Sequence, residues 1–125
     1  MQLTRRQTMK RASEFALVRA AGSSRAGRFL ILSTAPLPAE QADAARGDAE
    51  SRFGIITTRR MGHAVKRVLA RRRVRELLRK HGAPLAAGRY VVVVVRTSAA
   101  QATYAEMEQD FLRLLKRTLN KQAAC

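Results

Sequence analysis

The chain has 125 residues, a formal net charge of +16 and a pI near 11.7, and 46% of its residues are hydrophobic. A chain of this length can bury roughly two thirds of its unfolded surface. Residues 1–125 are therefore expected to fold as one domain without disulfide bonds or a structural metal. The charge favours nucleic acid as a partner over an acidic membrane surface. No membrane partner is expected, because Trp is absent and the densest apolar run, Tyr90 to Val95, is too short to span a bilayer.

The residue groupings that carry hydrolytic or metal chemistry are missing. The single cysteine, Cys125, excludes an intramolecular disulfide and a multi-cysteine metal site, and it fits a reducing, cytoplasmic compartment. His63 and His81 are the only histidines, and neither has a cysteine or a carboxylate cluster at metal-ligand spacing. There is no glycine-rich phosphate loop and no nucleophile-elbow serine. We therefore expect no catalytic residue, no metal site and no small-molecule substrate in this chain, so that any catalysis belongs to a partner.

The first third of the chain predicts an arm, a helix and a strand. Residues 1–11 are basic and lack the apolar core of a signal peptide, so they are expected to form a flexible basic arm. A helix is predicted from about Ala12 to Ala21, with Ser13 as a cap and Gly22 as its C-terminal stop. Turn residues follow, and the run RFLILST then predicts a strand over 28–34.

The next segment is acidic, in contrast to the basic residues before it. Residues 35–51 contain four acids and a single base, Arg46, which predicts an acidic surface loop. The run RFGIITT predicts a second strand over 52–58, paired antiparallel with the first strand across that loop.

The most basic stretch runs from Arg59 to Lys80 and holds ten of the 25 Lys and Arg residues against one acid, Glu76. It predicts a helix from about Val65 to a breaker at 81–84. At 100° per residue, one side is apolar and packs against the core, through Ala70, Val74, Leu77 and Leu78. The other side carries an i, i+4 row of like charges, made by Arg67, Arg71, Arg75 and Arg79, with Arg72 beside them. Such pairs repel by roughly 0.2–0.5 kcal/mol each unless anions neutralise them, so we interpret the row as a nucleic-acid-binding face rather than a merely solvated one.

The last third predicts a strand and a scaffold helix. The unbroken apolar run YVVVVVR over 90–96 is typical of a central strand covered on both faces. Thr103 and Glu106 form a capping box that starts the last helix. An apolar stripe then continues to about Lys121, and it comprises Tyr104, Met107, Phe111, Leu114, Leu115 and Leu119.

The motif in the basic stretch and the order of the elements resemble one known family. A strand starting at Phe53 ends in two basic residues, and it is followed by Gly62, Ala64-Val65, Arg67, Arg71-Arg72 and Arg75-Glu76. This pattern is similar to the signature of the bacterial ribonuclease P protein subunit, which reads roughly G-x-A-V-x-R-N-x-x-K-R-x-x-R-E. The segments SEFALV and YVVVVVR and the last helix also match the family in order, so the resemblance covers nearly the whole chain.

The resemblance implies a fold and a function. The fold is α+β, a two-layer α/β sandwich in the order helix, strands, helix, strand, helix, with a left-handed β-α-β crossover (ribosomal protein S5 domain 2-like). The function is that of an endoribonuclease subunit: a catalytic RNA removes the 5′ leader of precursor tRNA, and the protein binds both RNAs. The protein is expected to bind no cofactor alone, with Mg²⁺ accompanying the RNA, and to join the catalytic RNA as a monomer in a 1:1 ribonucleoprotein.

The resemblance also implies site residues. Those that contact the catalytic RNA would be Arg59, Arg60, Lys66, Arg67, Val68, Arg71, Arg72, Arg75 and Arg79. Those in the cleft that holds the leader would be Phe15, Arg19 and Ser33. Val68 departs from the family, which usually has Asn there, and Arg19 and Ser33 replace aromatic residues. Because stacking on an aromatic contributes about 1–3 kcal/mol per base, this cleft is expected to rely more on charge.

Two alternative functions would also account for the basic helix. The first is general RNA binding, as in a ribosome-associated protein or an RNA chaperone, without tRNA processing. The second is DNA binding or compaction with the basic helix in the major groove. The helix carries no Asn or Gln to read adenine, and nothing in the sequence suggests a dimer with paired half-sites, so DNA is the weaker alternative.

Overall fold

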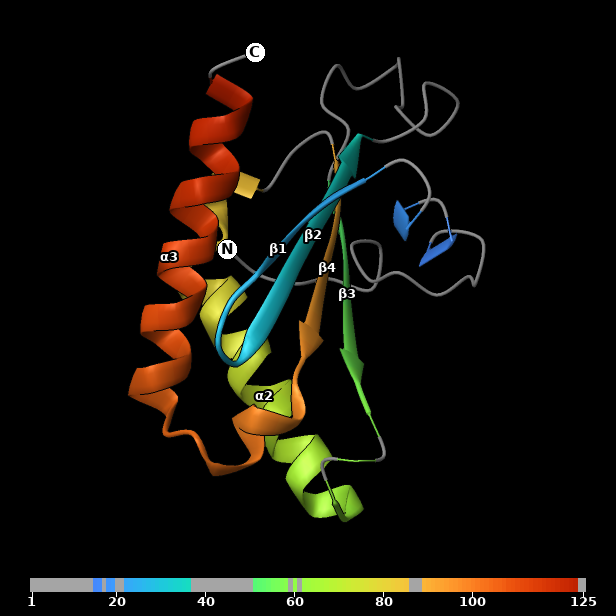
Figure 1. The fold of residues 1–125 in the computed structure, drawn as a ribbon, viewed down its shortest axis with the longest axis vertical. Helices are drawn as coiled ribbons and strands as arrows, with labels where there is room; N and C mark the ends of the chain where they lie inside the picture. Colours follow the sequence, from blue (N-terminus) through green and yellow to red (C-terminus); the bar gives the residue numbers. More distant parts are fainter. Residues whose placement is uncertain are drawn as a thin grey trace.

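The computed structural model describes residues 15–16, 18–19, 22–36, 51–58, 60, 62–85 and 89–123. One four-stranded sheet has the order β1-β2-β4-β3, from the strands β1 (Ser23–Ala26), β2 (Leu30–Pro36), β3 (Arg52–Thr57) and β4 (Arg89–Val95). The two long helices are α2 (Ala64–His81) and α3 (Tyr104–Ala123), and the short 3₁₀ turns are η3 (Ala83–Leu85) and η4 (Thr97–Gln101). Both long helices cover the same face of the sheet (Figure 1). The predicted two-layer α+β class is therefore confirmed.

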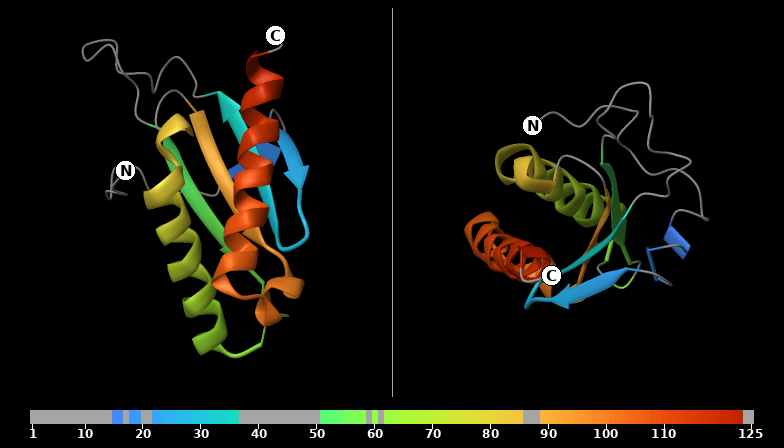
Figure 2. Two further views of the ribbon diagram at one scale, coloured as in Figure 1. Left: turned by 90° about the vertical axis from the view of Figure 1, so that its left-hand side faces the viewer. Right: turned by 90° about the horizontal axis from the view of Figure 1, so that it is seen from above.

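The β-α-β crossover from β3 through α2 to β4 has an unusual handedness. β3 and β4 are parallel neighbours, and α2 joins them across the helical face. With the helices toward the viewer, β3 runs down, α2 returns upward in front of it, and β4 runs down to the right of β3 (Figure 2, left). This path is left-handed, as the resemblance implies, whereas about 98% of such crossovers are right-handed.

The central strand β4 separates two apolar clusters. Val91, Val93 and Val95 face the helices and belong to the main core, where they pack with residues such as Phe111 and Leu77. The alternate residues face the opposite side, which we call the outer sheet face. This double burial explains why the run is apolar throughout and confirms the predicted central strand.

Part of the predicted first helix lies on the outer sheet face. Residues 15–16 and 18–19 are helical, and Val18 packs against Tyr90 and Val92. Gly22 ends the helical segment by donating its N–H to the carbonyl of Val18 at 2.8 Å. A Cβ at Gly22 would come within 2.4 Å of that carbonyl oxygen, so only glycine fits this close approach. The predicted arm, residues 1–11, lies outside the described residues.

Two predictions about the strands are wrong. The residues after Gly22 form the edge strand β1 rather than a turn, and they pair antiparallel with β2 from Ser23 opposite Thr34 onward. Serine and alanine are weak β-formers, so this strand depends on the backbone partners that β2 provides. In addition, β2 and β3 are not neighbours, because β4 lies between them and pairs with both. The apolar run of β4 requires cover on both edges and both faces, which places it at the centre.

The turn between β1 and β2 is tied to α3 by a buried carboxylate. Asp110 is 3% exposed and accepts the backbone N–H groups of Arg28, Phe29 and Leu30 at 3.0, 2.9 and 3.0 Å. A Cβ at Gly27 would lie 2.5 Å from each carboxylate oxygen, so the turn approaches Asp110 as closely as glycine allows. We call this arrangement the Asp110 clasp, and it holds the hairpin against the second layer.

The last helix begins as predicted. The Glu106 carboxylate accepts the Thr103 N–H at 3.0 Å, and the Thr103 hydroxyl accepts the Glu106 N–H at 3.2 Å, which is a complete capping box. The predicted stripe is buried at Met107, Phe111, Leu114 and Leu115, with Tyr104 and Leu119 partly buried beside it. Neither α2 nor α3 combines the length and apolar character needed to cross a bilayer.

Candidate nucleic-acid interface

The helix α2 is anchored by the apolar side that its sequence predicts. Ala70, Val74, Leu77 and Leu78 are buried in the main core. Gly62 has φ +111° and makes the turn before the helix, and Gly82 ends it by donating its N–H to Leu78. The basic residues are thus carried on a fixed helix, with the sheet on one side and solvent on the other.

The predicted arginine row winds around α2 rather than following one side. An i, i+4 step rotates about 40° around a helix of 3.6 residues per turn. Arg67 is accordingly half-buried, with an Nε that is buried and lacks a hydrogen-bond partner, whereas Arg71 and Arg75 are exposed. Arg72 is also exposed. No acid among the described residues forms an ion pair with any of these last three side chains.

The end of the row is already partly neutralised. Arg79 forks onto the Glu76 carboxylate with Nε and Nη2, at 3.1 Å for Nε. This contact lowers the pKa of Glu76 and raises the pKa of Arg79. Both side chains are exposed, so the pair adds little stability, but an anion must compete with Glu76 for this arginine.

The outward side of the first two turns of α2 is apolar. Val65, Val68 and Leu69 are 79%, 44% and 46% exposed. Val68 therefore lies at the surface beside two further apolar side chains, and the position that departs from the family signature belongs to an exposed apolar patch. The i, i+3, i+4 spacing of these residues was the available sequence signal for that patch.

On the flank of α2 that faces α3, the basic side chains make contacts within the protein. Arg73 donates to the carbonyl of Ala102 at 2.9 Å, and Lys80 lies over the Tyr104 ring with its Nζ 5.8 Å from the centroid. His81 Nε2 lies 2.9 Å from the Glu108 carboxylate. These contacts join α2 to α3 and to the segment just before it, so Arg73, Arg72 and Arg71 have different roles although they are adjacent in the sequence.

The two predicted surfaces meet at the edge strand β3. α2 packs over β3 while α3 packs over β1 and β2 (Figure 2). Because Arg73 points toward α3, the opposite flank of α2, with Arg71 and Arg75, lies on the side of the sheet edge. Among the described residues, β3 alone therefore separates this arginine flank from the outer sheet face.

The residues predicted for the leader cleft lie at or over the outer sheet face. Phe15 is half-buried against the cluster of Val18 and Tyr90, and Arg19 is exposed. Ser33 is 8% exposed and shares a 2.7 Å hydrogen bond with Ser24 across the β1–β2 pair. The residues that sequence reasoning missed are those that alternate along the strands on this face, Ile31, Ala35, Ile56, Tyr90, Val92 and Val94. The period-2 pattern of β4 could have identified three of them.

The remaining predicted residues differ in how they are placed. Lys66 is exposed near the start of α2, and Arg60 is exposed just before it. Arg59 lies outside the described residues. Across the described part of the chain, no three His, Cys, Asp or Glu side chains come together as a metal site.

Comparison with known proteins identifies the family. The sequence pattern of the family described as Ribonuclease P matches residues 3–119. A ribonuclease P protein component of Thermus scotoductus is 37% identical over 94 residues, covering 75% of this chain and 51% of that protein. The one from Chloroflexus aggregans is 33% identical over 116 residues, covering 92% of this chain and 79% of the relative. The chain spans about half the length of the Thermus relatives that it matches.

Solved structures show the same fold. A Staphylococcus aureus RNase P protein mutant with defective mRNA degradation activity has a TM-score of 0.76 at 22% identity, covering 90% of this chain and 88% of that one. The RNase P protein from Thermotoga maritima has a TM-score of 0.71 at 24% identity, covering 88% of this chain and 96% of its own. On the sequence match, which extends over most of its length, this chain belongs to the ribonuclease P protein family.

Proposed function

We propose that this protein is the protein subunit of a ribonuclease P, which assists a catalytic RNA in removing the 5′ leader of precursor tRNA. Family membership supports the proposal. The observation that carries it is the exposed arginine flank of α2, where Arg71, Arg72 and Arg75 have no acid partner among the described residues. A polyanion is the partner that satisfies such a flank.

The chemistry of this chain would be binding rather than bond cleavage. Arginine can direct two N–H donors onto the oxygens of one phosphate, and a row of such groups on a rigid helix recognises the shape of a folded RNA. The Mg²⁺-dependent cleavage would belong to the RNA. The protein would act in the cytoplasm as one copy on one catalytic RNA.

The leader of the precursor tRNA would lie on the outer sheet face. Phe15 supplies one aromatic surface there, and Arg19 is exposed at its border. Within the described part of the chain, only β3 lies between the arginine flank and this face, so one RNA assembly can contact both surfaces at once. This arrangement favours a subunit that bridges a catalytic RNA and its substrate over a protein with a single binding face.

A cleavage assay tests the proposed function. We expect the protein to accelerate 5′ leader removal by its cognate catalytic RNA at low Mg²⁺ by ~10-fold or more, which corresponds to about 1.4 kcal/mol. The measurement is the rate of release of a labelled leader from precursor tRNA, with and without protein. Tight binding to the RNA without any acceleration would instead favour a general RNA-binding protein.

Binding to the catalytic RNA should depend steeply on salt. If about five phosphates are neutralised, a plot of log affinity against log salt concentration should have a slope of roughly −3.5 to −4.5. The slope can be measured by filter binding or fluorescence anisotropy between 50 and about 300 mM salt. A nearly flat dependence would contradict an electrostatic interface.

A further inference from the structure

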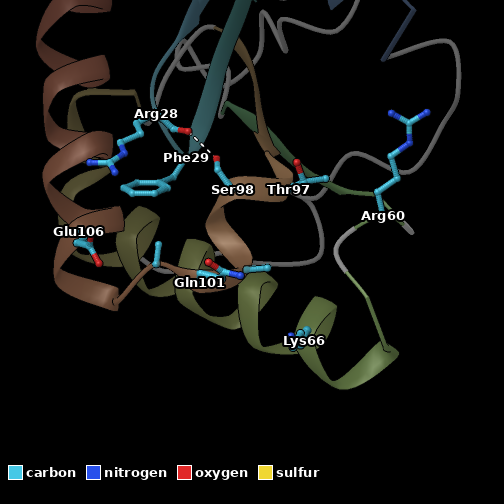
Figure 3. Close-up of a pocket in the computed structure, with 10 residues that line it drawn as sticks. Arg28, Phe29, Arg60, Lys66, Thr97, Ser98, Gln101 and Glu106 are labelled. Carbon is cyan, nitrogen blue, oxygen red and sulfur yellow. Dashed lines mark hydrogen bonds between the residues drawn. The ribbon is translucent and has the colours of Figure 1, made fainter.

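A basic hollow lies on the flank of α2 that faces α3, opposite to Arg71 and Arg75. It has a volume of about 670 Å³ and opens between the β1–β2 turn, η4 and the beginning of α2 (Figure 3). Its charged lining residues are Arg28, Arg60, Lys66 and Glu106. We call this hollow the η4 groove. Three cations against one acid give its lining an excess of positive charge, on a side of the helix away from Arg71 and Arg75.

The positive charge of the η4 groove is not consumed internally. Arg28 lies over the Phe29 ring, with its guanidinium carbon 5.1 Å from the centroid, and no carboxylate among the described residues is within ion-pair distance of Arg28 or Lys66. Glu106 is occupied by the capping box, whose hydrogen bonds from Thr103 lower its pKa, with a smaller contribution from Arg28. Arg28 lies at one end of the groove and Arg60 at the other, where the Arg60 guanidinium points outward (Figure 3). Arg28 and Lys66 are therefore the cations that can meet a ligand inside the groove.

Hydrogen bonds within the protein fix the walls of the groove. The Ser98 hydroxyl donates to the Arg28 carbonyl at 2.7 Å, and Arg96 donates to the Gly27 carbonyl at 2.8 Å. Arg73 fixes Ala102 at the other side, and the Asp110 clasp fixes the turn that carries Arg28. A ligand would meet a preorganised wall, so little of its binding free energy would be lost in ordering the protein.

A cavity of about 30 Å³, which has room for about one water molecule, adjoins the η4 groove. It shares Lys66 and Ala100 with the groove, and Leu69, Arg73 and Met107 also line it. Leu69 is 46% exposed, so it offers an apolar surface beside the cationic end. Thr97 and Gln101 also line the groove, and neither side chain makes a hydrogen bond within the described structure. Cations that can bind phosphate, polar groups without hydrogen-bond partners and the apolar surface of Leu69 together match the parts of a nucleotide.

We propose that the η4 groove binds a single-stranded RNA segment, with its phosphates at Arg28 and Lys66 and a base or ribose against Leu69 and Ala100. An unpaired strand is favoured over a duplex because only an unstacked nucleotide can lay an apolar face against the exposed side chain of Leu69. The proposal rests on the proposed function and extends it to a third RNA-contacting surface. The segment belongs either to the catalytic RNA or to the precursor tRNA, which share this chemistry.

Site-directed crosslinking tests the proposal. In a Cys125→Ser background, a photoreactive thiol reagent is attached to Thr97→Cys, and the protein is assembled with the cognate catalytic RNA and precursor tRNA. We expect Thr97→Cys to crosslink to RNA well above a Leu112→Cys control on α3. Labelling the two RNAs in turn identifies which one lies in the groove, and either result supports the proposal.

A second reference position separates the two proposals. Val68→Cys lies beside the exposed arginines of α2 and should crosslink if the proposed function is right. Crosslinking at Val68→Cys without any at Thr97→Cys overturns the groove and leaves the proposed function intact. The absence of crosslinks at both positions overturns both.

Charge removal provides an independent measurement. Arg28→Gln combined with Lys66→Gln should make the salt slope of RNA binding less steep by about 1.4–1.8 and weaken binding at 0.15 M salt by about 20-fold. Arg113→Gln with Lys116→Gln, on the exposed side of α3, removes the same charge and should have a much smaller effect. Equal effects of the two pairs would mean that only net charge matters, and the groove assignment would fail. Thermal unfolding checks that both variants are folded.

Discussion

Reversing Arg71 and Arg75 to glutamate together is expected to weaken binding of the catalytic RNA by about 10²–10³-fold at 0.15 M salt. Two phosphate contacts are lost, and two negative charges are placed where phosphates would lie, which together change the local charge by four. Both side chains are exposed, and the buried side of α2 is unchanged. The fold should therefore survive, and the affinity can be measured directly by anisotropy of a labelled RNA.

A matched variant distinguishes a local contact from general attraction. Arg113→Glu with Lys116→Glu changes the net charge equally on α3 and should weaken binding far less. If both double variants lose the same affinity, the protein binds RNA through its overall charge of +16 rather than through α2. If the circular dichroism spectrum of Arg71→Glu/Arg75→Glu collapses, the arginine flank is structural, and the interface assignment is wrong.

Replacing Asp110 by asparagine is expected to lower the free energy of unfolding by about 3 kcal/mol, since an unsatisfied buried group alone costs roughly 1–3 kcal/mol. The carboxylate accepts three backbone N–H groups with two oxygens, whereas an amide has one oxygen and turns an NH₂ toward the remaining N–H. For a domain whose total stability is about 5–15 kcal/mol, this is a large fraction. Urea unfolding followed by circular dichroism measures the change.

A double-mutant cycle tests whether the effect comes from the clasp. Gly27→Ala should also destabilise the protein, because its new Cβ would meet the Asp110 carboxylate at 2.5 Å. In an Asp110→Ala background the carboxylate is gone and the new Cβ no longer meets it, so the two losses should be less than additive. Additive losses would contradict a direct interaction. A control substitution at an exposed residue of the same helix, Lys116→Gln, should leave the clasp unaffected.

The elements with strong periodicity could be predicted from the sequence. The two long helices and the central strand each bury a long apolar stripe or run, and the structure confirms all three. The edge strand β1 could not be predicted, because its residues have little β-propensity and it forms only on the backbone of β2. The sequence pattern of the last helix predicts no specific role for Asp110. Its spacing from Met107 and Leu114 places it on the buried stripe, which was the missed signal for the clasp.

The sequence predicts the helix that carries the site, but it does not predict which of its side chains form the exposed surface. Sequence alone cannot tell Arg73, which holds the carbonyl of Ala102, from Arg72, which is exposed, because the direction toward α3 depends on the order of the strands. The same limit hid the η4 groove. Arg28 and Lys66 are distant in sequence, and they line the same groove only because the β1–β2 turn is fixed on α3.

The central position of β4 has a consequence for how the chain folds. The strands β2 and β3 lie on either side of β4, and β3 pairs with no other strand in the described part of the chain. During synthesis β3 must wait until residues 89–95 have left the ribosome, whereas β2 can already pair with β1. The Asp110 clasp joins residues 80 to 82 positions apart and forms later still. Such distant contacts slow folding, so the basic helix is exposed on a nascent chain before the sheet beneath it exists. A polyanion that binds this helix early would therefore act on an unfinished protein.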